Sequence, residues 1–282
     1  IKKSNMSSLN CAEEVYLSEK LIDMHKHFDM VKYARTGGEA NSIAIRIARA
    51  ATGRDKIAIC GYHGWHDWYL SAAMNSNNNL DKHLMKNIKH DGVPKELKNT
   101  SHPFTYGNFY ELEKISKKYD LAAVKLEVAR SSSPDIDFLK KVRDFTKRKR
   151  IVLIFDECTS GFRCNYGGLH LKTGVNPDLV MFGKTLGNGY PITAVSGRAT
   201  IMKRAENSFI SSTFWTDKIG YVAALETLKK MKKIKSWEKI LVNSKYLEKK
   251  WLDLAKKHNL KVSISGFKAI TSFIFEKDQS IL

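Results

Sequence analysis

The sequence contains few cysteines and no long apolar segment. Four cysteines occur among its 282 residues, and none belongs to a C-x-x-C pair or to a nearby histidine pattern of the kind that binds zinc. We therefore expect no metal site, and scattered free thiols are typical of the reducing cytoplasm. No apolar run approaches the roughly 18 residues that a membrane-spanning helix needs, so we expect no membrane segment.

Acidic residues are scarce, because 29 Asp and Glu stand against 48 Lys and Arg, for a net charge of +19. Such an excess could indicate a nucleic-acid partner. The basic residues, however, are spread along helical stretches such as 140–150 and 247–259, where they alternate with acids and apolar residues. We interpret them as solvated helix faces and expect no nucleic-acid partner. A charge-driven nucleic-acid binder stays a minor alternative, whose affinity for duplex DNA would fall steeply with salt.

Short apolar runs alternate with segments of helical periodicity, which predicts an α/β fold with a mostly parallel sheet between helices. We expect residues 76–102 to be largely irregular. The expected helices are 12–28, 39–52, 110–119, 134–149, 200–206, 217–231 and 237–258, and the expected strands are 30–34, 56–60, 121–128, 151–157, 177–183, 193–198, 261–266 and 269–276.

Two parts are predicted along the chain. Residues 1–232 would form a large domain, and residues 233–282 a connecting helix followed by the start of a smaller C-terminal α+β domain. The chain begins at Ile1 rather than Met and ends just after a strand-like run, so we expect it to be part of a longer protein.

The stretch FGKTLGNG, residues 182–189, raises two chemical possibilities for Lys184. A glycine and a threonine flank this lysine, as in the phosphate-binding loop G-x-x-x-x-G-K-[ST]. That motif requires glycine five residues before Gly183, where this chain has Asp178 at the start of an expected strand. A phosphate loop needs glycine there because its backbone N–H groups wrap the phosphates. The nucleotide interpretation therefore fails, and covalent chemistry remains.

Several polar residues and glycines follow the expected strands. In open α/β sheets, ligands bind outside the carboxyl ends of the strands. We therefore expect these residues to converge on one cleft. They are Thr36, Gly37, Gly38, Tyr62, His63, Glu127, Asp156, Glu157 and Lys184.

The turn at Gly37 and Gly38 is suited to a phosphate. The turn opens a helix, where free backbone N–H groups and the helix dipole favour an anion, and glycine allows close approach. The alternative is an ordinary turn that only caps the helix. Tyr62 could stack on an aromatic ring or simply pack, and His63 could be a ligand or a hydrogen-bonded loop residue.

Asp156 and Lys184 form the most informative pair. Asp156 follows four apolar strand residues, and a poorly solvated carboxylate needs a cation, such as a protonated pyridine nitrogen. Alternatively, the Asp156 side chain could cap the next turn or form an ion pair with Arg163. Lys184 at a strand end in apolar company would lose its charge by desolvation and become a nucleophile that forms a Schiff base, although a surface lysine is the alternative. Together with the phosphate turn, these groups describe a pyridoxal phosphate (PLP) site.

The sequence resembles the class III PLP-dependent aminotransferases, in particular the branch of glutamate-1-semialdehyde aminomutase and its aminotransferase-like relatives. The resemblance implies the PLP-dependent transferase fold of type I, with an incomplete small domain. Its motifs run in the family's order and keep a spacing of 28 residues between Asp156 and Lys184. The matching stretches are 35–57, 60–69, 155–163, 177–198 and 211–228.

The resemblance also implies roles for the residues that match. Lys184 would hold the cofactor through a Schiff base and then move protons, and Asp156 would keep the ring nitrogen protonated. Tyr62 would stack on the ring. The backbone amides of Gly37 and Gly38 would bind the phosphate.

Three further residues complete the expected set. Thr213 would reach the phosphate of a neighbouring subunit, which implies a homodimer with shared active sites. Glu127 matches a family glutamate of less defined role. Cys158 stands where a ring-packing valine is common, and this departure, with Val128 in place of proline and Gly38 in place of threonine, points to an altered substrate.

The leading functional prediction is a transaminase that passes an amino group from a donor to the cofactor and then to a carbonyl acceptor. An aminomutase, which uses the same groups on one substrate, is the alternative. A binding protein that has lost turnover is a third possibility, which the retention of both Lys184 and Asp156 disfavours.

Overall fold

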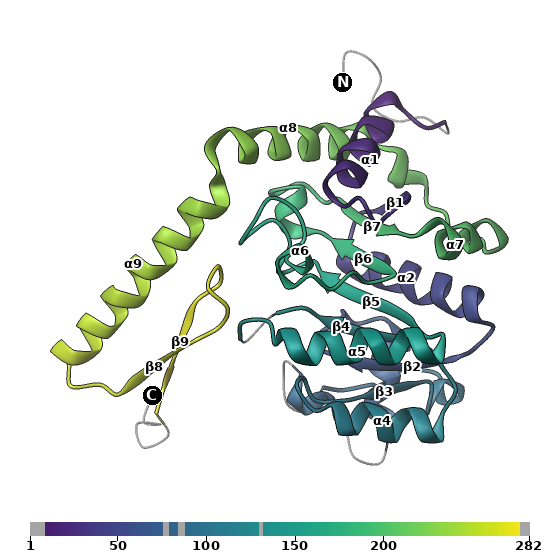
Figure 1. The fold of residues 1–282 in the computed structure, drawn as a ribbon, viewed down its shortest axis with the longest axis horizontal. Helices are drawn as coiled ribbons and strands as arrows, with labels where there is room; N and C mark the ends of the chain where they lie inside the picture. Colours follow the sequence, from purple (N-terminus) through teal and green to yellow (C-terminus); the bar gives the residue numbers. More distant parts are fainter. Residues whose placement is uncertain (1–8, 76–78, 84–87, 130–131, 277–282) are drawn as a thin grey trace.

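The structure is a computed structural model that describes residues 9–75, 79–83, 88–129 and 132–276. Its centre is a seven-stranded sheet with the strand order β1-β7-β6-β5-β4-β2-β3, and a separate hairpin pairs β8 with β9 (Figure 1). The strands are β1 Met30–Ala34, β2 Lys56–Cys60, β3 Ser101–Pro103, β4 Leu121–Glu127, β5 Val152–Glu157, β6 Leu179–Phe182, β7 Thr193–Gly197, β8 Val262–Ser265 and β9 Ser272–Phe275.

The central strands of the sheet are parallel. Strands β2 to β6 share one direction, whereas β7 runs antiparallel to β6 and β1 antiparallel to β7. Strand β1 therefore points the same way as the central strands. This confirms the predicted α/β fold with a mostly parallel sheet, and it brings the carboxyl ends of β1, β2, β4, β5 and β6 to one edge.

Helices cover both faces of this sheet. Helix α2 lies on one face, and α4 and α5 lie on the other (Figure 1). The helices are α1 Ala12–Met24, α2 Gly37–Thr52, α3 Asp67–Leu70, α4 Phe109–Lys118, α5 Ile136–Lys149, α6 His170–Thr173, α7 Ala199–Met202, α8 Lys218–Ile234 and α9 Ser236–Lys257.

Local sequence features fix both ends of helix α2. The side chain of Thr36 accepts a hydrogen bond from the Glu39 amide at 3.2 Å, and the Glu39 carboxylate accepts one from the Thr36 amide at 2.8 Å. This capping box satisfies two donors at the start of the helix. Gly53 ends the helix with φ 67°, a left-handed conformation that glycine adopts without strain.

Alternation along the strands separates two apolar cores. On β5, Leu153 and Phe155 belong to the core beneath α4 and α5, whereas Ile154 belongs to the core beneath α2. Side chains of a strand point to opposite faces in turn. Asp156 therefore shares the α2 face with Ile154, and Glu157 points to the opposite face.

The C-terminal part leaves the sheet. Helices α8 and α9 meet at Lys235, which has φ 48°, and α9 carries the chain away to the β8–β9 hairpin (Figure 1). The loop between β8 and β9 packs against the main core through the buried side chain of Phe267. The predicted division at residue 232 falls inside α8, and it stays a prediction.

Three local expectations differ from the structure. The first expected helix ends at Met24 instead of residue 28, because the His25 amide closes the last turn on Ile22. The helix expected at 200–206 is divided into α7 and a 3₁₀ turn at Lys203–Asn207. Strand β3 begins within the stretch expected to be irregular and pairs with β2. No helix of the described residues is long and apolar enough to cross a membrane.

Candidate active site

Asp156 is the centre of a buried polar cluster at the carboxyl edge of the sheet. Its side chain is 4% exposed, and one oxygen, Oδ2, lies 2.9 Å from His63 Nδ1 and 3.6 Å from Lys125 Nζ. The other oxygen, Oδ1, accepts the Cys158 amide at 3.1 Å. This contact matches one alternative for Asp156, the capping of the next turn, whereas Arg163, the other alternative, instead donates to the Thr159 carbonyl.

Electrostatics keep this carboxylate ionised. Burial alone would raise the pKa of Asp156, but the charge of Lys125 and the hydrogen bond from His63 hold that pKa well below its usual range. Burial, followed by the charge of Lys125, lowers the pKa of His63 to about 4. His63 is therefore neutral near pH 7, and its Nδ1 carries the hydrogen because a carboxylate can only accept.

Lys184 lies two residues after the end of β6, the strand that pairs with the strand of Asp156. Its Nζ donates to Thr159 Oγ1 at 2.7 Å, and its backbone adopts φ 42°. The side chain is exposed. The expected desolvation by apolar neighbours is therefore wrong for this part of the chain, because the strand end projects Lys184 beyond the core and the described residues leave it open to solvent.

The Gly37–Gly38 turn lies close to the same edge. A methyl group on Gly37 would lie 3.8 Å from Cys158 Sγ, and one on Gly183 would lie 3.4 Å from the same sulfur. Cys158 thus lies between the helix start and the lysine strand. A methyl group on Gly64 would lie 3.3 Å from the Gly38 Cα, so the loop after β2 also packs on this turn.

We expect Gly38→Ala to destabilise the protein more than Gly37→Ala. The added methyl group at Gly38 would lie 2.7 Å from His66 Nε2, whereas the one at Gly37 makes an ordinary contact. His66 is held by Ser42 Oγ at 2.7 Å, so it cannot move without losing that bond. Overpacking of this kind costs about 1–3 kcal/mol. Urea unfolding of both variants would test this, and equal stabilities would contradict it.

A hydrogen bond links Tyr62 to Glu127 at the carboxyl edge of the sheet. Glu127 Oε2 accepts the Tyr62 amide at 3.0 Å. The Tyr62 ring is half-buried and meets the Tyr69 ring edge-on, with centroids 6.0 Å apart. Glu127 is also the register partner of Asp156 on the neighbouring strand. The two carboxylates therefore lie side by side on the α2 face.

Thr213 is exposed, at the start of a 3₁₀ turn, Thr213–Thr216. This turn is anchored beside α2 of the same chain, because Arg35 Nε donates to the Phe214 carbonyl at 2.8 Å and Trp215 Nε1 to Glu39 Oε1 at 3.4 Å. Sequence analysis did not single out Arg35. The expected contact of Thr213 with a neighbouring subunit stays a prediction.

Lys125 was also missed by sequence analysis. It is wholly buried in the middle of β4, and its amine approaches Asp156. The signal was present, since Lys125 is a charged residue inside the apolar run LAAVKLE. A charge in such a strand needs a partner, and Asp156 on the adjacent strand is within reach.

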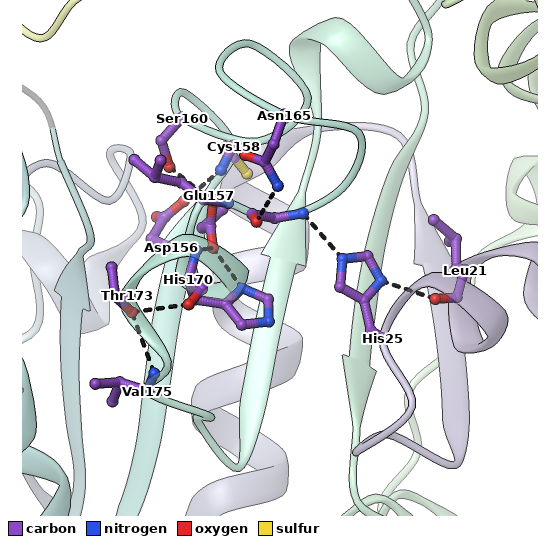
Figure 2. Close-up of polar contacts among 12 residues, drawn as sticks. Leu21, His25, Asp156, Glu157, Cys158, Ser160, Asn165, His170, Thr173 and Val175 are labelled. Carbon is purple, nitrogen blue, oxygen red and sulfur yellow. Dashed lines mark hydrogen bonds and ion pairs between the residues drawn. The ribbon is translucent and has the colours of Figure 1, made fainter. Parts of the chain in front are cut away.

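Glu157 points to the face of the sheet opposite Asp156, where it makes polar contacts with His170 and its neighbours (Figure 2). Its Oε1 lies 2.6 Å from His170 Nδ1 and also accepts the His170 amide at 2.9 Å. His25 joins α1 to this region, since Nδ1 lies 2.7 Å from the Leu21 carbonyl and Nε2 accepts the Gly168 amide at 2.9 Å. Glu157 is therefore a structural residue that fixes the segment after Asp156.

We expect the buried histidines to make folding stability depend on pH. Burial, followed by the charge of His170, lowers the pKa of His25 from 6.5 to about 4, as for His63. The unfolded chain therefore binds the proton first, so stability is complete above pH 6.5 and falls as the pH drops toward 4. The loss between pH 7 and pH 5 is about 2 kcal/mol per histidine. Urea unfolding at both pH values would measure it, and an unchanged pH dependence in His25→Gln would contradict the role of His25.

A cavity of about 880 Å³ lies at the opposite, amino edge of the sheet. Its basic lining residues include Arg143 and Arg198, which also approach the carboxylate of Asp178 at 3.0 and 3.8 Å. This cavity is remote from Asp156 and Lys184. We place the chemistry at the carboxyl edge because the buried carboxylate and the exposed lysine are both there.

Residues 2–281 match the family described as aminotransferase class III. The chain belongs to the class III aminotransferases. This agrees with the resemblance carried by the sequence motifs.

Relatives of this class III chain include both transferases and mutases. The 3-aminobutyryl-CoA aminotransferase of Cloacimonas acidaminovorans is 31% identical over 273 residues, which cover 94% of this chain and 62% of that protein. The glutamate-1-semialdehyde 2,1-aminomutase of Sulfolobus acidocaldarius is 34% identical over 224 residues, which cover 76% of this chain and 52% of that protein. The chain thus spans between about half and two thirds of these curated relatives.

Solved structures share the fold of this class III chain. The FumI protein of Sphingopyxis sp. MTA144, in its PLP internal aldimine form, has a TM-score of 0.87 and 24% identity, and the match covers 98% of this chain and 65% of that one. An omega-transaminase from Sphaerobacter thermophilus has a TM-score of 0.84, also at 24% identity, and the match covers 98% of this chain and 66% of that one. At this identity the likeness establishes the PLP-dependent transferase fold.

Proposed function

We propose that this chain is the cofactor-binding part of a PLP-dependent aminotransferase that moves an amino group between a donor and a carbonyl acceptor. One observation carries the proposal. Asp156 is buried and ionised at the carboxyl edge of the sheet, and Lys184 follows the adjacent strand with an exposed amine. A fixed anion for a ring nitrogen and an amine for an aldehyde are the two groups that PLP requires.

The other residues fit the cofactor. The Gly37 and Gly38 amides lie in the first turn of a 16-residue helix, where unpaired N–H groups and the dipole favour a phosphate. A side chain at Gly38 would collide with His66, so this turn requires glycine. Tyr62 and Cys158 flank the same edge and would pack on the ring. When bound, PLP withdraws electrons from the substrate carbon that bears the amino group.

The residues of the chain would supply the remaining chemistry. Lys184 Nζ would hold the cofactor covalently until the amino group of the substrate displaces it, and the freed amine would then take a proton from one substrate position and return it to another. Thr159 orients this amine through its 2.7 Å hydrogen bond. Asp156 would hold the ring nitrogen, and His63 fixes Asp156 Oδ2 at 2.9 Å.

An aminomutase is the second candidate, because relatives with that name are as similar to this chain as the aminotransferase relative is. It would use the same residues on one substrate that bears both groups. A non-catalytic PLP-fold protein is less well supported, since Lys184 and Asp156 are both retained.

The assembly and location belong to the same proposal. We infer a homodimer in which Thr213 contributes to the phosphate site of the neighbouring subunit, and a cytoplasmic location that suits its four free cysteines. Sedimentation of the full-length protein as a monomer would contradict the shared site.

Borohydride reduction of the PLP-loaded full-length protein, followed by peptide mass mapping, tests the central claim. The expected result is a stable pyridoxyl group on Lys184. Failure to take up PLP, or labelling elsewhere, would overturn the proposal. Supplying a separate amino donor and carbonyl acceptor then distinguishes the candidates, because exchange between two molecules favours the aminotransferase.

A further inference from the structure

A buried lysine, Lys125, lies beside the carboxylate of Asp156. Lys125 is in the middle of β4 with a wholly buried side chain. It shares the α2 face of the sheet with Glu127, two residues further along the same strand. A buried lysine is costly unless a counter-ion compensates it, so its place beside Asp156 requires an explanation.

Lys125 and His63 both contact the same oxygen of Asp156. Lys125 Nζ lies 3.6 Å from Asp156 Oδ2 and 3.4 Å from Met181 Sδ on β6. The same Oδ2 accepts His63 at 2.9 Å, while Oδ1 is engaged by the Cys158 amide at 3.1 Å. Met181 is only a weak acceptor. The charge of Asp156 is therefore already shared before any ring nitrogen reaches it.

Among the described residues, the other titratable groups beside Asp156 supply no further positive charge. His63, from the loop after β2, is neutral near pH 7, and burial keeps Cys158 a neutral thiol with a pKa well above its usual value. Glu127, on β4 itself, uses an oxygen for the Tyr62 amide. Lys125 is thus the group whose positive charge acts directly on Asp156.

On the basis of the proposed function, we propose that Lys125 competes with the cofactor's ring nitrogen for the charge of Asp156 and so lowers the proton affinity of that nitrogen. An alkyl amine is a stronger base than a pyridine nitrogen, so the ring yields its proton to solvent first. Burial lowers the pKa of Lys125, but the charge of Asp156 opposes that shift. A ring that holds its proton less firmly withdraws electrons less strongly, which makes Lys125 a positioning residue that tunes the reaction.

The ring proton can be observed directly in the full-length protein loaded with PLP that carries ¹⁵N at the ring nitrogen. We compare wild type with Lys125→Met, which removes the charge, and with Lys125→Arg, which keeps it. The ¹⁵N shift in Lys125→Met should titrate about one pH unit or more above wild type, equivalent to a tenfold change in proton affinity. Lys125→Arg should stay at or below wild type. Coincident titrations of wild type and Lys125→Met, or a rise in Lys125→Arg, would overturn the inference.

A measurement on wild type alone covers the case in which Lys125→Met fails to fold. The 1-deaza analogue of PLP carries C–H at the ring position and cannot be protonated there. Because Lys125 weakens the bond between Asp156 and the ring nitrogen, wild type should bind PLP and the analogue within about tenfold of one another. A larger preference for PLP would refute the competition. If neither compound binds and Lys184 is not labelled by borohydride, the proposed function itself has failed.

Discussion

Lys184→Ala is expected to reduce turnover by about 10³-fold or more, because it removes both the nucleophile and the group that moves the proton. The folded state should persist, since Lys184 is exposed and its side chain donates one hydrogen bond, to Thr159. Surface changes of this kind alter the free energy of unfolding by about 0.5 kcal/mol or less. Steady-state kinetics with an amino donor and a carbonyl acceptor, beside urea unfolding, would separate lost chemistry from lost structure.

Thr159→Val provides a matched control for this variant. It keeps the amine but removes the 2.7 Å contact that orients it. We expect turnover to fall by about tenfold, the scale of one hydrogen bond to a charged group, while borohydride still labels Lys184. If Lys184→Ala retained a borohydride-sensitive absorbance, another amine would be the attachment point.

The layout of the site could be predicted from the strand ends. Parallel strands with apolar sequences end at the same edge, so Glu127, Asp156 and Lys184 were expected there before any coordinates. The structure confirms the mostly parallel sheet and gives the registers that pair Glu127 with Asp156 and Asp156 with Met181. Local sequence signals were sufficient to place these residues, because the direction of the strands decides which strand ends meet at one edge of the sheet.

The partners of Asp156 were harder to predict. A charged residue in the apolar run of β4 signals that Lys125 needs a partner, but not which oxygen it reaches, and the path of the loop that carries His63 leaves no periodic signal. The expected desolvation of Lys184 was wrong for a related reason. A strand end tells where a lysine lies, but its burial depends on what covers that edge.

Asp156→Asn is expected to affect activity and stability together. Without the anion, the ring nitrogen of bound PLP loses its counter-charge, and turnover should fall by about 10²–10³-fold, as when one charge-stabilising group is removed from an active site. The apoprotein should also lose about 3–5 kcal/mol, because Lys125 remains buried with its contacting carboxylate gone. Kinetics of the loaded enzyme and urea unfolding of the apoprotein would measure the two effects.

The double variant Asp156→Asn with Lys125→Met separates these effects. Removing both members of a buried ion pair is far less costly than removing one, because no uncompensated charge is left in the core. The double variant should therefore regain most of the stability lost in Asp156→Asn, yet its turnover should stay low because the ring nitrogen still lacks an anion. Recovery of turnover along with stability would mean that Asp156 serves the fold alone. Failure to recover stability would show that Lys125 is not what makes the buried carboxylate necessary.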